Sequence, residues 1–255
     1  MNCRICASRL PDPFAESQML GRLIKYYTCK ACGYVQTEEP TWLEEAYERA
    51  INLSDTGIMA RNGSNVGLVL ATLTLMRKRY ATVVDYAGGY GFLVRLLRDK
   101  GVNALWSDPY SDNLVARGFE YSRGDKASLV TAFEAFEHFV HPVKEMEKML
   151  AISSNILLTT SLVPSPIPQP SQWWYYGLDH GQHVGLYQLQ TLRHLAKRFD
   201  LRLITDNHST HFFSRDKYSA LAWRLLSRLG RQLPNVMAAG LVSKTWSDYQ
   251  SISGV

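Results

Sequence analysis

The stretch Val83-Val-Asp85-Tyr-Ala-Gly88-Gly89-Tyr-Gly91 decides the fold of this 255-residue chain. Its β-branched residues predict a buried strand that ends in an acid, and a turn of small residues then leads into a helix. Glycines let the backbone turn sharply and allow a ligand to approach the main chain closely. Asp108 follows Gly89 at the end of the next expected strand, where a carboxylate can accept hydrogen bonds from both hydroxyls of a ribose.

Short strands and helices alternate from residue 81 onward. This alternation predicts a mainly parallel, Rossmann-like α/β sheet with helices on both faces, and ligands bind such sheets beyond the carboxyl ends of the strands. The expected strands are 82–86, 103–107, 118–121, 128–133, 155–160, 201–205 and 210–214, and the expected helices are 92–100, 142–150, 189–199 and 217–229.

Two further helices are expected ahead of this sheet. Thr41 and Glu44 have the spacing of a capping box, which predicts a helix over 41–53, and an apolar stripe predicts a second helix over 65–80. The expected division of the chain is a cysteine region (1–40), a helical lead-in covering the site (41–80), a Rossmann-like domain (81–215) and a C-terminal helical extension (216–255).

The cysteines of the chain all lie near its start, as the two pairs Cys3-x-x-Cys6 and Cys29-x-x-Cys32. Each pair presents two thiolates on a tight turn, and two pairs complete the tetrahedron that zinc prefers. Disulfides are the alternative, which a reducing compartment disfavours. A four-thiolate site leaves no open coordination position, so we expect a small zinc-ribbon-like knob that holds a structural metal.

The glycine turn departs from the dinucleotide-binding fingerprint, which needs a further glycine where bulkier residues follow Gly91. Asp-x-Ala-Gly-Gly-x-Gly at 85–91 instead resembles the first motif of class I S-adenosylmethionine-dependent methyltransferases, with Ala87 where glycine is usual. The stretch Thr-Ala-Phe-Glu-Ala-Phe-Glu-His-Phe-Val-His-Pro at 131–142 resembles the fourth-strand motif of the same family. The resemblance covers about residues 45–215 and implies the class I methyltransferase fold.

The resemblance also implies which residues hold S-adenosylmethionine. The methionine part would contact Asp85, Ala87, Gly88, Gly89 and Gly91, the ribose Asp108, and the adenine Pro109 and Tyr110, while Ala132, Phe133 and Glu134 would close the other side. A four-cysteine region ahead of such a domain is similar to the layout of bacterial methyltransferases that act on sugars or nucleotide-linked sugars. It is also similar to the layout of certain ribosomal RNA methyltransferases.

Residues 161–185 form a long segment without an expected element, and such segments are usually functional. Its Trp-Trp-Tyr-Tyr run at 173–176 offers rings that can stack on a sugar or a base, or that simply plug the segment onto the body. His180 and His183 follow this run, and a zinc role is not expected for either because no cysteine lies nearby.

Methyl transfer to a hydroxyl or to a carbon acid needs a base, and histidine suits that role near neutral pH. We expect His183 or His180 to be the base, and Glu137 with His138 is the competing pair. A structural role remains the alternative for each of these histidines.

The leading hypothesis is a methyltransferase that acts at O or C of a small molecule, a sugar or a nucleotide-linked sugar, by in-line displacement. The alternative is an RNA methyltransferase that grips its substrate with the cysteine region, where Arg4, Arg9, Arg22, Lys25, Lys30, Tyr26 and Tyr27 interleave charge and aromatic rings. Two weaker alternatives are a non-catalytic module with a degenerate cofactor fold and a nicotinamide dehydrogenase.

The composition is that of an ordinary globular protein, with 46% hydrophobic and 20% charged residues. The formal charge of +5 suits an anionic substrate or RNA but demands neither. No apolar run reaches the roughly 20 residues that a bilayer span needs, and the N-terminus lacks an apolar secretory segment, so the cytoplasm is the expected compartment. Helix 217–229 can rest on a membrane or a partner subunit, but packing on the domain is the preferred interpretation.

Overall fold

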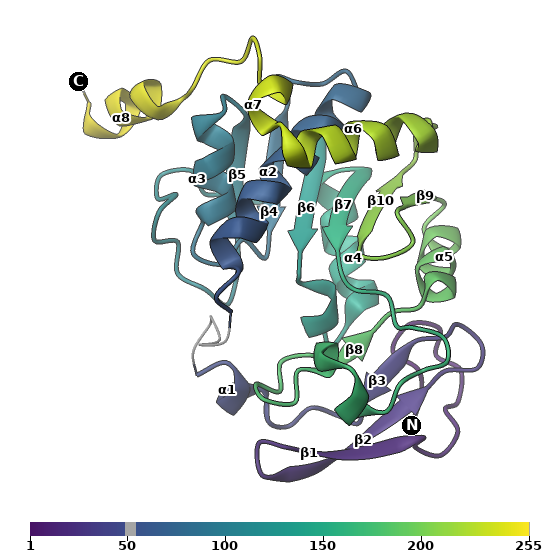
Figure 1. Ribbon diagram of the computed structural model, residues 1–255. Helices are drawn as coiled ribbons and strands as arrows, with labels where there is room; N and C mark the ends of the chain where they lie inside the picture. The colour runs from purple at the N-terminus through teal and green to yellow at the C-terminus, as the bar shows by residue number, and fades with distance from the viewer. Residues whose placement is uncertain (49–54, 255) are drawn as a thin grey trace. The chain divides into compact units, whose positions relative to one another are not determined.

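The computed structural model describes residues 1–48 and 55–254 of the chain (Figure 1). Its internal contacts form two compact units. The first unit comprises Met1–Asn52, Phe133–Lys148 and Leu158–Arg215, and the second comprises Leu53–Ala132, Met149–Leu157 and Asp216–Val255. Each unit is therefore assembled from stretches that are far apart in the sequence.

The larger sheet has the strand order β5-β4-β6-β7-β10-β9. Strands β5 and β6 both run parallel to β4, whereas β9 and β10 form an antiparallel hairpin. The strands are β4 (Thr82–Tyr86), β5 (Asn103–Ser107), β6 (Leu129–Phe133), β7 (Asn155–Thr159), β9 (Arg202–Thr205) and β10 (Thr210–Ser214). Helices flank this parallel-rich sheet, so the Rossmann-like α/β fold expected from the sequence is confirmed.

The expected strands agree with the observed ones to within one residue, with one exception. Residues 118–121 were expected to form a strand, but they make only an isolated bridge between Glu120 and Trp106 of β5. Gly118 has a φ of 89°, which breaks the extended conformation at the start of this segment. The prediction of a strand there is wrong.

The four helices expected after β4, which are α3 to α6, begin and end within three residues of their expected bounds, whereas α7 and α8 were not individually predicted. The helices are α1 (Leu43–Ala46), α2 (Ile58–Leu75), α3 (Phe92–Asp99), α4 (Pro142–Ile152), α5 (Leu189–Arg198), α6 (Ala220–Gln232), α7 (Pro234–Met237) and α8 (Thr245–Ser253). Short 3-10 helices η1 (Phe136–His138), η2 (Pro170–Gln172) and η3 (Trp174–Tyr176) lie between them.

The two leading helices differ more from expectation. Helix α1 spans only Leu43–Ala46, and its N-cap is Trp42 without a side-chain capping bond, so the capping box at Thr41 is wrong. Trp42 is buried instead, and its indole N–H donates to the Gly181 carbonyl at 2.9 Å. The expected continuation over 49–53 lies outside the described residues. Helix α2 begins at Ile58 rather than at residue 65, and it ends at Leu75 rather than at residue 80, because Arg77 adopts a left-handed φ of 56°.

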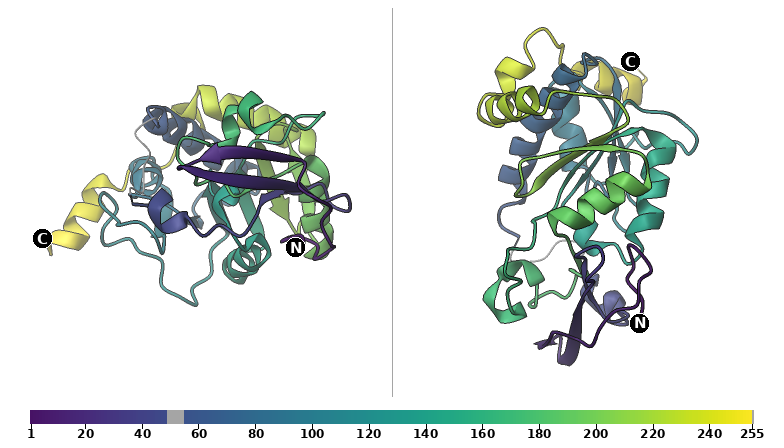
Figure 2. Two further views of the ribbon diagram at one scale, coloured as in Figure 1. Left: turned by 90° about the horizontal axis from the view of Figure 1, so that it is seen from below. Right: turned by 90° about the vertical axis from the view of Figure 1, so that its right-hand side faces the viewer.

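Residues 1–40 contribute most of a second, smaller sheet that the sequence did not predict. Strands β1 (Ala15–Met19) and β2 (Arg22–Thr28) lie side by side as a hairpin (Figure 2, left), and β3 (Val35–Thr37) pairs with β2. The fourth strand, β8 (Gly185–Leu186), comes from the far end of the long segment and completes the order β1-β2-β3-β8. The cysteine region therefore obtains its last strand from a distant part of the chain.

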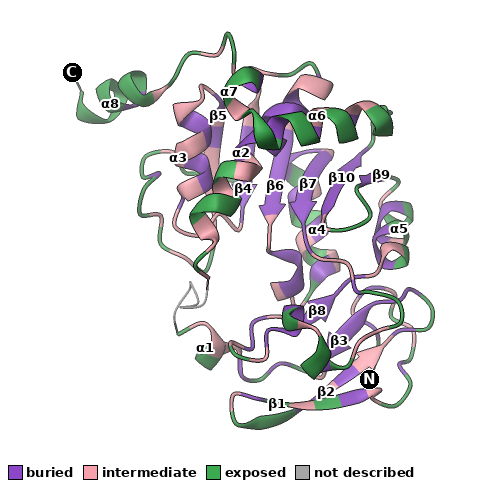
Figure 3. Ribbon diagram, viewed as in Figure 1, coloured by how far each residue is buried: buried purple, intermediate pink, exposed green. Residues whose placement is uncertain are grey.

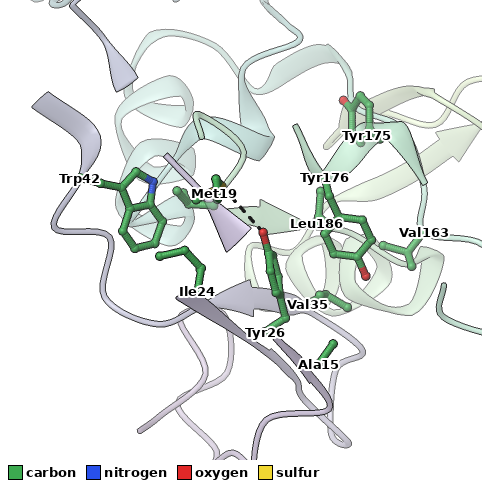
Figure 4. Close-up of a cluster of buried hydrophobic side chains, with 11 residues drawn as sticks. Ala15, Met19, Ile24, Tyr26, Val35, Trp42, Val163, Tyr175, Tyr176 and Leu186 are labelled. Carbon is green, nitrogen blue, oxygen red and sulfur yellow. Dashed lines mark hydrogen bonds between the residues drawn. The ribbon is translucent and has the colours of Figure 1, made fainter. Parts of the chain in front are cut away.

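The long segment also completes the hydrophobic core beneath this sheet (Figure 4). Tyr26 on β2 packs edge-on against Tyr176 with ring centroids 5.1 Å apart, and both rings are buried. Tyr175 and Leu186 belong to the same cluster. Part of the aromatic run is therefore a plug for this core, as one of the two interpretations expected.

Helices α2 and α6 pack together within the second unit at two glycines. A Cβ on Gly67 would overlap the Gly230 carbonyl oxygen, and a Cβ on Gly230 would overlap that of Gly67. Trp223 of α6 is buried beside this crossing, and its indole N–H donates to Thr72 Oγ1 at 3.2 Å. Helix α6 therefore packs on the domain, as the preferred interpretation expected.

Gly67→Ala should destabilise the protein by about 3 kcal/mol, because overpacking usually costs about 1–3 kcal/mol and here the obstacle is main chain rather than a movable side chain. Gly63 lies in the same helix, and a Cβ added there would meet no atom within 4 Å. Gly63→Ala should therefore stabilise the protein by up to about 1 kcal/mol through helix propensity. Urea unfolding of both variants measures the difference, and equal free energies of unfolding would contradict the close crossing.

Helix α8 is tied to α3 in the second unit by a buried ion pair. The Arg98 guanidinium donates Nη2–H to Asp248 Oδ1 at 2.6 Å and Nε–H to Asp248 Oδ2 at 2.7 Å. Arg95 adds a third bond to the same carboxylate at 2.9 Å. Although burial opposes the charged form, these arginines hold the pKa of Asp248 below its usual value.

Candidate functional site

Asp108 lies directly against the glycine turn, as the sequence spacing predicted. Its Oδ2 accepts the Gly89 N–H at 2.9 Å, and its Oδ1 accepts the N–H groups of Tyr110 and Ser111 at 2.8 and 3.1 Å. These bonds fix the carboxylate at the carboxyl end of β5, next to the end of β4. The acid and the turn therefore form one local structure rather than two unrelated surface features.

Asp85, near the carboxyl end of β4, is buried and accepts a hydrogen bond from Thr131 Oγ1 at 2.6 Å. Burial raises the pKa of Asp85 to about 7, the Thr131 hydroxyl opposes this change, and the charge of Asp108 adds to it. Two neighbouring carboxyl groups at one sheet edge favour a positively charged group beside them. Such a group would offset the desolvation penalty of the buried carboxylate and the repulsion between the two carboxylates.

The turn uses the left-handed region of the backbone at three positions. Ala87, Gly89 and Gly91 have φ values of 62°, 52° and 89°. Glycine adopts this region freely, so the glycine usual at the position of Ala87 in the related motif has a steric reason. Ala87 accepts the same conformation at a cost of about 1 kcal/mol.

Trp106 is a residue of this site that sequence reasoning missed. Its indole N–H donates to the Gly89 carbonyl at 2.7 Å, and a Cβ at Gly88 would come within 2.8 Å of its ring. Gly88 thus lets the ring lie on the turn. An aromatic residue two positions before the strand-end acid was the signal that the sequence offered.

The other predicted cofactor residues lie at the ends of neighbouring strands. Thr131 is opposite Asp85 in the parallel register of β4 and β6, and Ala132, buried, follows it. Phe133 ends β6, and Pro109 is exposed directly after Asp108. The assignment of Ala132, Phe133 and Pro109 to the cofactor therefore rests on their positions at these strand ends.

Glu134 follows β6 with a φ of 47°, which is uncommon for a residue other than glycine and is often found at functional sites. The Glu134 N–H donates to two oxygens of Thr159, the carbonyl at 3.1 Å and Oγ1 at 3.0 Å. The Tyr175 hydroxyl lies 3.2 Å from its Oε2.

The first unit brings together all of the predicted catalytic residues. The His183 ring meets His138 edge-on at 4.9 Å between centroids and His180 at 4.9 Å, and it lies 4.8 Å from the Tyr175 ring. Ligand atoms of Glu137, His138 and His183 all lie within 4.8 Å of one another. Residues from η1 and from the long segment therefore form one cluster, here called the histidine cluster: Glu134, Glu137, His138, Tyr175, His180 and His183.

Hydrogen bonds define the tautomers of two of these histidines. His183 Nδ1 lies 2.6 Å from the Tyr175 carbonyl, so it carries the proton, and Nε2 retains the lone pair. His180 Nδ1 accepts the Gln182 N–H at 3.1 Å, which places its proton on Nε2. Burial lowers the pKa of His183 to about 4, so its ring is neutral at physiological pH.

His138 has a partner that the sequence did not assign. The Tyr47 hydroxyl lies 2.8 Å from His138 Nδ1, which links the segment after α1 to the histidine cluster. Burial, followed by the nearby His183 and His180, holds the pKa of His138 well below its usual value. His138 is therefore also neutral.

Glu137 is completely buried, and its Oε1 accepts the Tyr175 hydroxyl at 2.6 Å. Its Oε2 has no hydrogen-bond partner among residues 1–48 and 55–254. Burial and then the charge of Glu134 raise the pKa of Glu137 to about 8, whereas the Tyr175 hydroxyl opposes the change. The carboxyl group is therefore largely protonated at neutral pH.

The cysteine pairs converge as their spacing predicted. The Sγ atoms of Cys3 and Cys32 are 3.6 Å apart, those of Cys6 and Cys29 are 3.4 Å apart, and all four lie within 4.8 Å of one another. None is bonded to another as a disulfide. A tetrahedral zinc with Zn–S bonds of about 2.3 Å places its sulfurs about 3.8 Å apart, so the four thiols fit such an ion.

The Rossmann-like sheet with an acid held against a glycine turn defines the class of the protein, an α/β protein of the Rossmann-like type. A family model described as a methyltransferase domain matches residues 60–206, more than half of the 255 residues. The chain belongs to this methyltransferase family and is an S-adenosylmethionine-dependent methyltransferase.

Several solved structures are similar to this chain. Magnesium protoporphyrin IX methyltransferase from Synechocystis PCC 6803, with bound SAH, is 14% identical with a TM-score of 0.45, over 68% of this chain and 94% of that one. An O-methyltransferase family protein from Burkholderia thailandensis is 15% identical with a TM-score of 0.49, over 69% and 68%. The plantazolicin methyltransferase BpumL is 12% identical with a TM-score of 0.49, over 76% and 89%. No curated protein sequence matches significantly.

Proposed function

We propose that this enzyme methylates O or C of a small-molecule acceptor in the cytoplasm, and that the acceptor is a sugar or a nucleotide-linked sugar. The observation that carries the proposal is the histidine cluster, in which a neutral imidazole nitrogen and a buried carboxyl group lie together. The expected division into a cysteine region, a lead-in (41–80), a methyltransferase domain (81–215) and an extension (216–255) belongs to this proposal.

The glycine turn and its two acids hold S-adenosylmethionine in this proposal. Asp85 and the main chain of 87–91 bind the methionine part, whose ammonium group suits the two neighbouring carboxyls. Asp108 accepts hydrogen bonds from the ribose hydroxyls, which replace some of the main-chain N–H groups that now donate to its carboxylate. Pro109 lies beside the adenine, and Ala132, Phe133 and Glu134 enclose the cofactor from β6.

The bound cofactor supplies a methyl group on a positively charged sulfur. When bound, it would offer the methyl carbon to the acceptor atom, and its sulfur would keep the electron pair of the broken carbon–sulfur bond. The acceptor proton passes to a base, for which we propose His183 Nε2, since its Nδ1 proton is fixed on the Tyr175 carbonyl. His180, or the pair Glu137 and His138, is the alternative.

The RNA alternative is weakened by the contacts of the cysteine region. The Arg4 guanidinium donates to the carbonyls of Thr37, Glu38 and Val184, and Arg22 pairs with Glu45 at 2.5 Å. Tyr26 is buried in the core. Arg4 and Tyr26 are therefore engaged inside the protein, and Arg22 is paired at its surface, which favours the small-molecule acceptor.

We also propose that Cys3, Cys6, Cys29 and Cys32 bind one structural zinc ion. Their spacing and the converging sulfurs support this assignment. Four thiolates occupy every position of a tetrahedral ion, so the metal has no site for substrate and stabilises the small sheet.

A binding and activity panel tests the proposed function. Calorimetry with S-adenosylhomocysteine should give binding in the micromolar range, and methyl transfer from S-adenosylmethionine should occur with a nucleotide sugar and remain insensitive to salt. Methylation of RNA that falls steeply between about 50 and 200 mM salt would favour the alternative instead. If the protein did not bind S-adenosylhomocysteine at millimolar concentration, the interpretation as a non-catalytic module would remain. Binding of NAD(P)H would indicate a dehydrogenase.

His183→Ala should leave cofactor affinity unchanged and lower kcat by about 10²–10⁴-fold, the usual contribution of a general base. His208→Ala, at an exposed position in the β9–β10 turn, is the matched control and should keep full activity. Because burial depresses the pKa of His183 to about 4, the base stays neutral as the pH falls, so kcat measured with saturating S-adenosylmethionine should decline only below about pH 5. Normal turnover by His183→Ala would transfer the role to His180 or to Glu137 and His138.

A further inference from the structure

Helix α6 carries an apolar stripe on the side that does not pack on α2. Leu221, Leu225 and Leu229 are spaced four residues apart, which places them along one face of the helix. They are 69%, 58% and 40% exposed, whereas Trp223 and Ser227 on the other face are buried (Figure 3). This face, here called the leucine stripe, is exposed within the described part of the second unit.

The stripe continues past the end of α6. Leu233 is 48% exposed, and Val236 in α7 is 58% exposed. A single exposed leucine needs no explanation, but a row of exposed apolar side chains on a well-packed helix is typical of an interaction surface.

A row of basic residues lies beside the stripe. Arg224, Arg228 and Arg231 follow one another at spacings of four and three residues, about 20–80° around the helix from the nearest leucines at 100° per residue. All three positions are exposed. From Lys217 to Lys244 the chain holds five basic residues and no Asp or Glu.

We propose that the leucine stripe docks on the surface of an anionic lipid bilayer. A helix that exposes leucines beside arginines fits a bilayer interface, where the apolar side chains enter the acyl boundary and the arginines contact lipid phosphates. No helix among residues 1–48 and 55–254 is long and apolar enough to cross a membrane, so α6 lies on the surface rather than through it. Its 13 residues extend about 20 Å along that surface.

The charge of α6 favours a bilayer over a second copy of this chain as the partner of the leucine stripe. Two copies joined through their stripes about a two-fold axis would bring both arginine rows together, and like charges repel. An anionic bilayer instead supplies the opposite charge. The packing of Trp223 and Gly230 on α2 holds the stripe outward before any lipid is bound, so docking needs no refolding.

Vesicle co-sedimentation of the full chain tests the proposal. Wild-type protein should bind mixed vesicles of phosphatidylglycerol and phosphatidylcholine at least tenfold more tightly than vesicles of pure phosphatidylcholine. Leu225→Glu should lower binding to the anionic vesicles at least tenfold, and Arg228→Glu several-fold. Leu114→Glu, at a leucine of the same unit that is 53% exposed but lies outside α6, should bind like wild type.

Docking on lipid is separate from methyl transfer, so S-adenosylhomocysteine binding should be the same in all these variants and reports that each is folded. Equal binding by wild type and Leu225→Glu would overturn the proposal, as would absence of binding to anionic vesicles. A wild-type dimer in sedimentation velocity that Leu225→Glu converts to monomer would also overturn it, in favour of a contact between copies.

Discussion

Cys29→Ser should abolish the proposed zinc binding and unfold the small sheet of β1, β2 and β3. Cys29 is buried, its N–H donates to the Tyr34 carbonyl at 2.8 Å, and its carbonyl accepts the Gly33 N–H at 2.7 Å, so the proposed metal ligand and the turn before β3 are one structure. Structural zinc contributes about 10–16 kcal/mol of apparent folding free energy in small four-ligand units. Loss of one thiolate should remove most of it, since three ligands no longer close the tetrahedron.

The measurement is zinc content by mass spectrometry, together with limited proteolysis of the N-terminal cysteine region. Ala31→Ser, at the exposed position between Cys29 and Cys32, adds the same hydroxyl without removing a ligand and should retain one zinc and full protection. Addition of a chelator to the wild type should reproduce the effect of Cys29→Ser. A Cys29→Ser protein that resists protease as well as the wild type would show that zinc does not stabilise this sheet.

Asp108→Ala should weaken S-adenosylhomocysteine binding by at least about 100-fold. A hydrogen bond to a charged group contributes about 1.5–3 kcal/mol, and the ribose offers two hydroxyls to this carboxylate, so the lost free energy corresponds to roughly 10²–10⁴ in affinity. The same change leaves the N–H groups of Gly89, Tyr110 and Ser111 without their acceptor, which should loosen the turn as well.

Calorimetry measures the affinity, and thermal unfolding without ligand separates it from a general loss of fold. Asp112→Ala, an exposed acid in the same loop, is the control and should bind like the wild type. The affinity of Asp108→Asn should lie between those of Asp108→Ala and the wild type, because an amide keeps one acceptor oxygen. Unchanged affinity in Asp108→Ala would remove the ribose contact from the proposed function.

Much of the glycine turn with its strand-end acid was predictable because its signals are local. The strand, the turn and the strand-end acid all lie in the single stretch from Val83 to Asp108, and each depends on the conformational preference of single residues. Trp106 was missed because an aromatic residue in a strand is ordinary. Only the structure shows that its ring lies against the glycine turn, where Gly88 has no side chain to obstruct it.

The histidine cluster was predictable as a set of candidates but not as an arrangement. His138 and His183 are in ring contact although they belong to different segments of the chain, and Tyr47 reaches His138 from still further away in the sequence. Protonation also needed the structure, because the raised pKa of Glu137 comes from burial and from Glu134. The residue types alone do not set either distance or burial.

By itself the sequence determined the alternating α/β order, the glycine turn with its acids, and the two Cys-x-x-Cys pairs, because periodicity, turn chemistry and ligand spacing act over a few neighbouring residues. Only the tertiary structure decided that β8 completes the N-terminal sheet, that Gly67 meets Gly230, and which side of α6 faces outward. These features join parts of the chain that are distant in sequence, and their free energy comes from packing and main-chain approach, which no local pattern encodes.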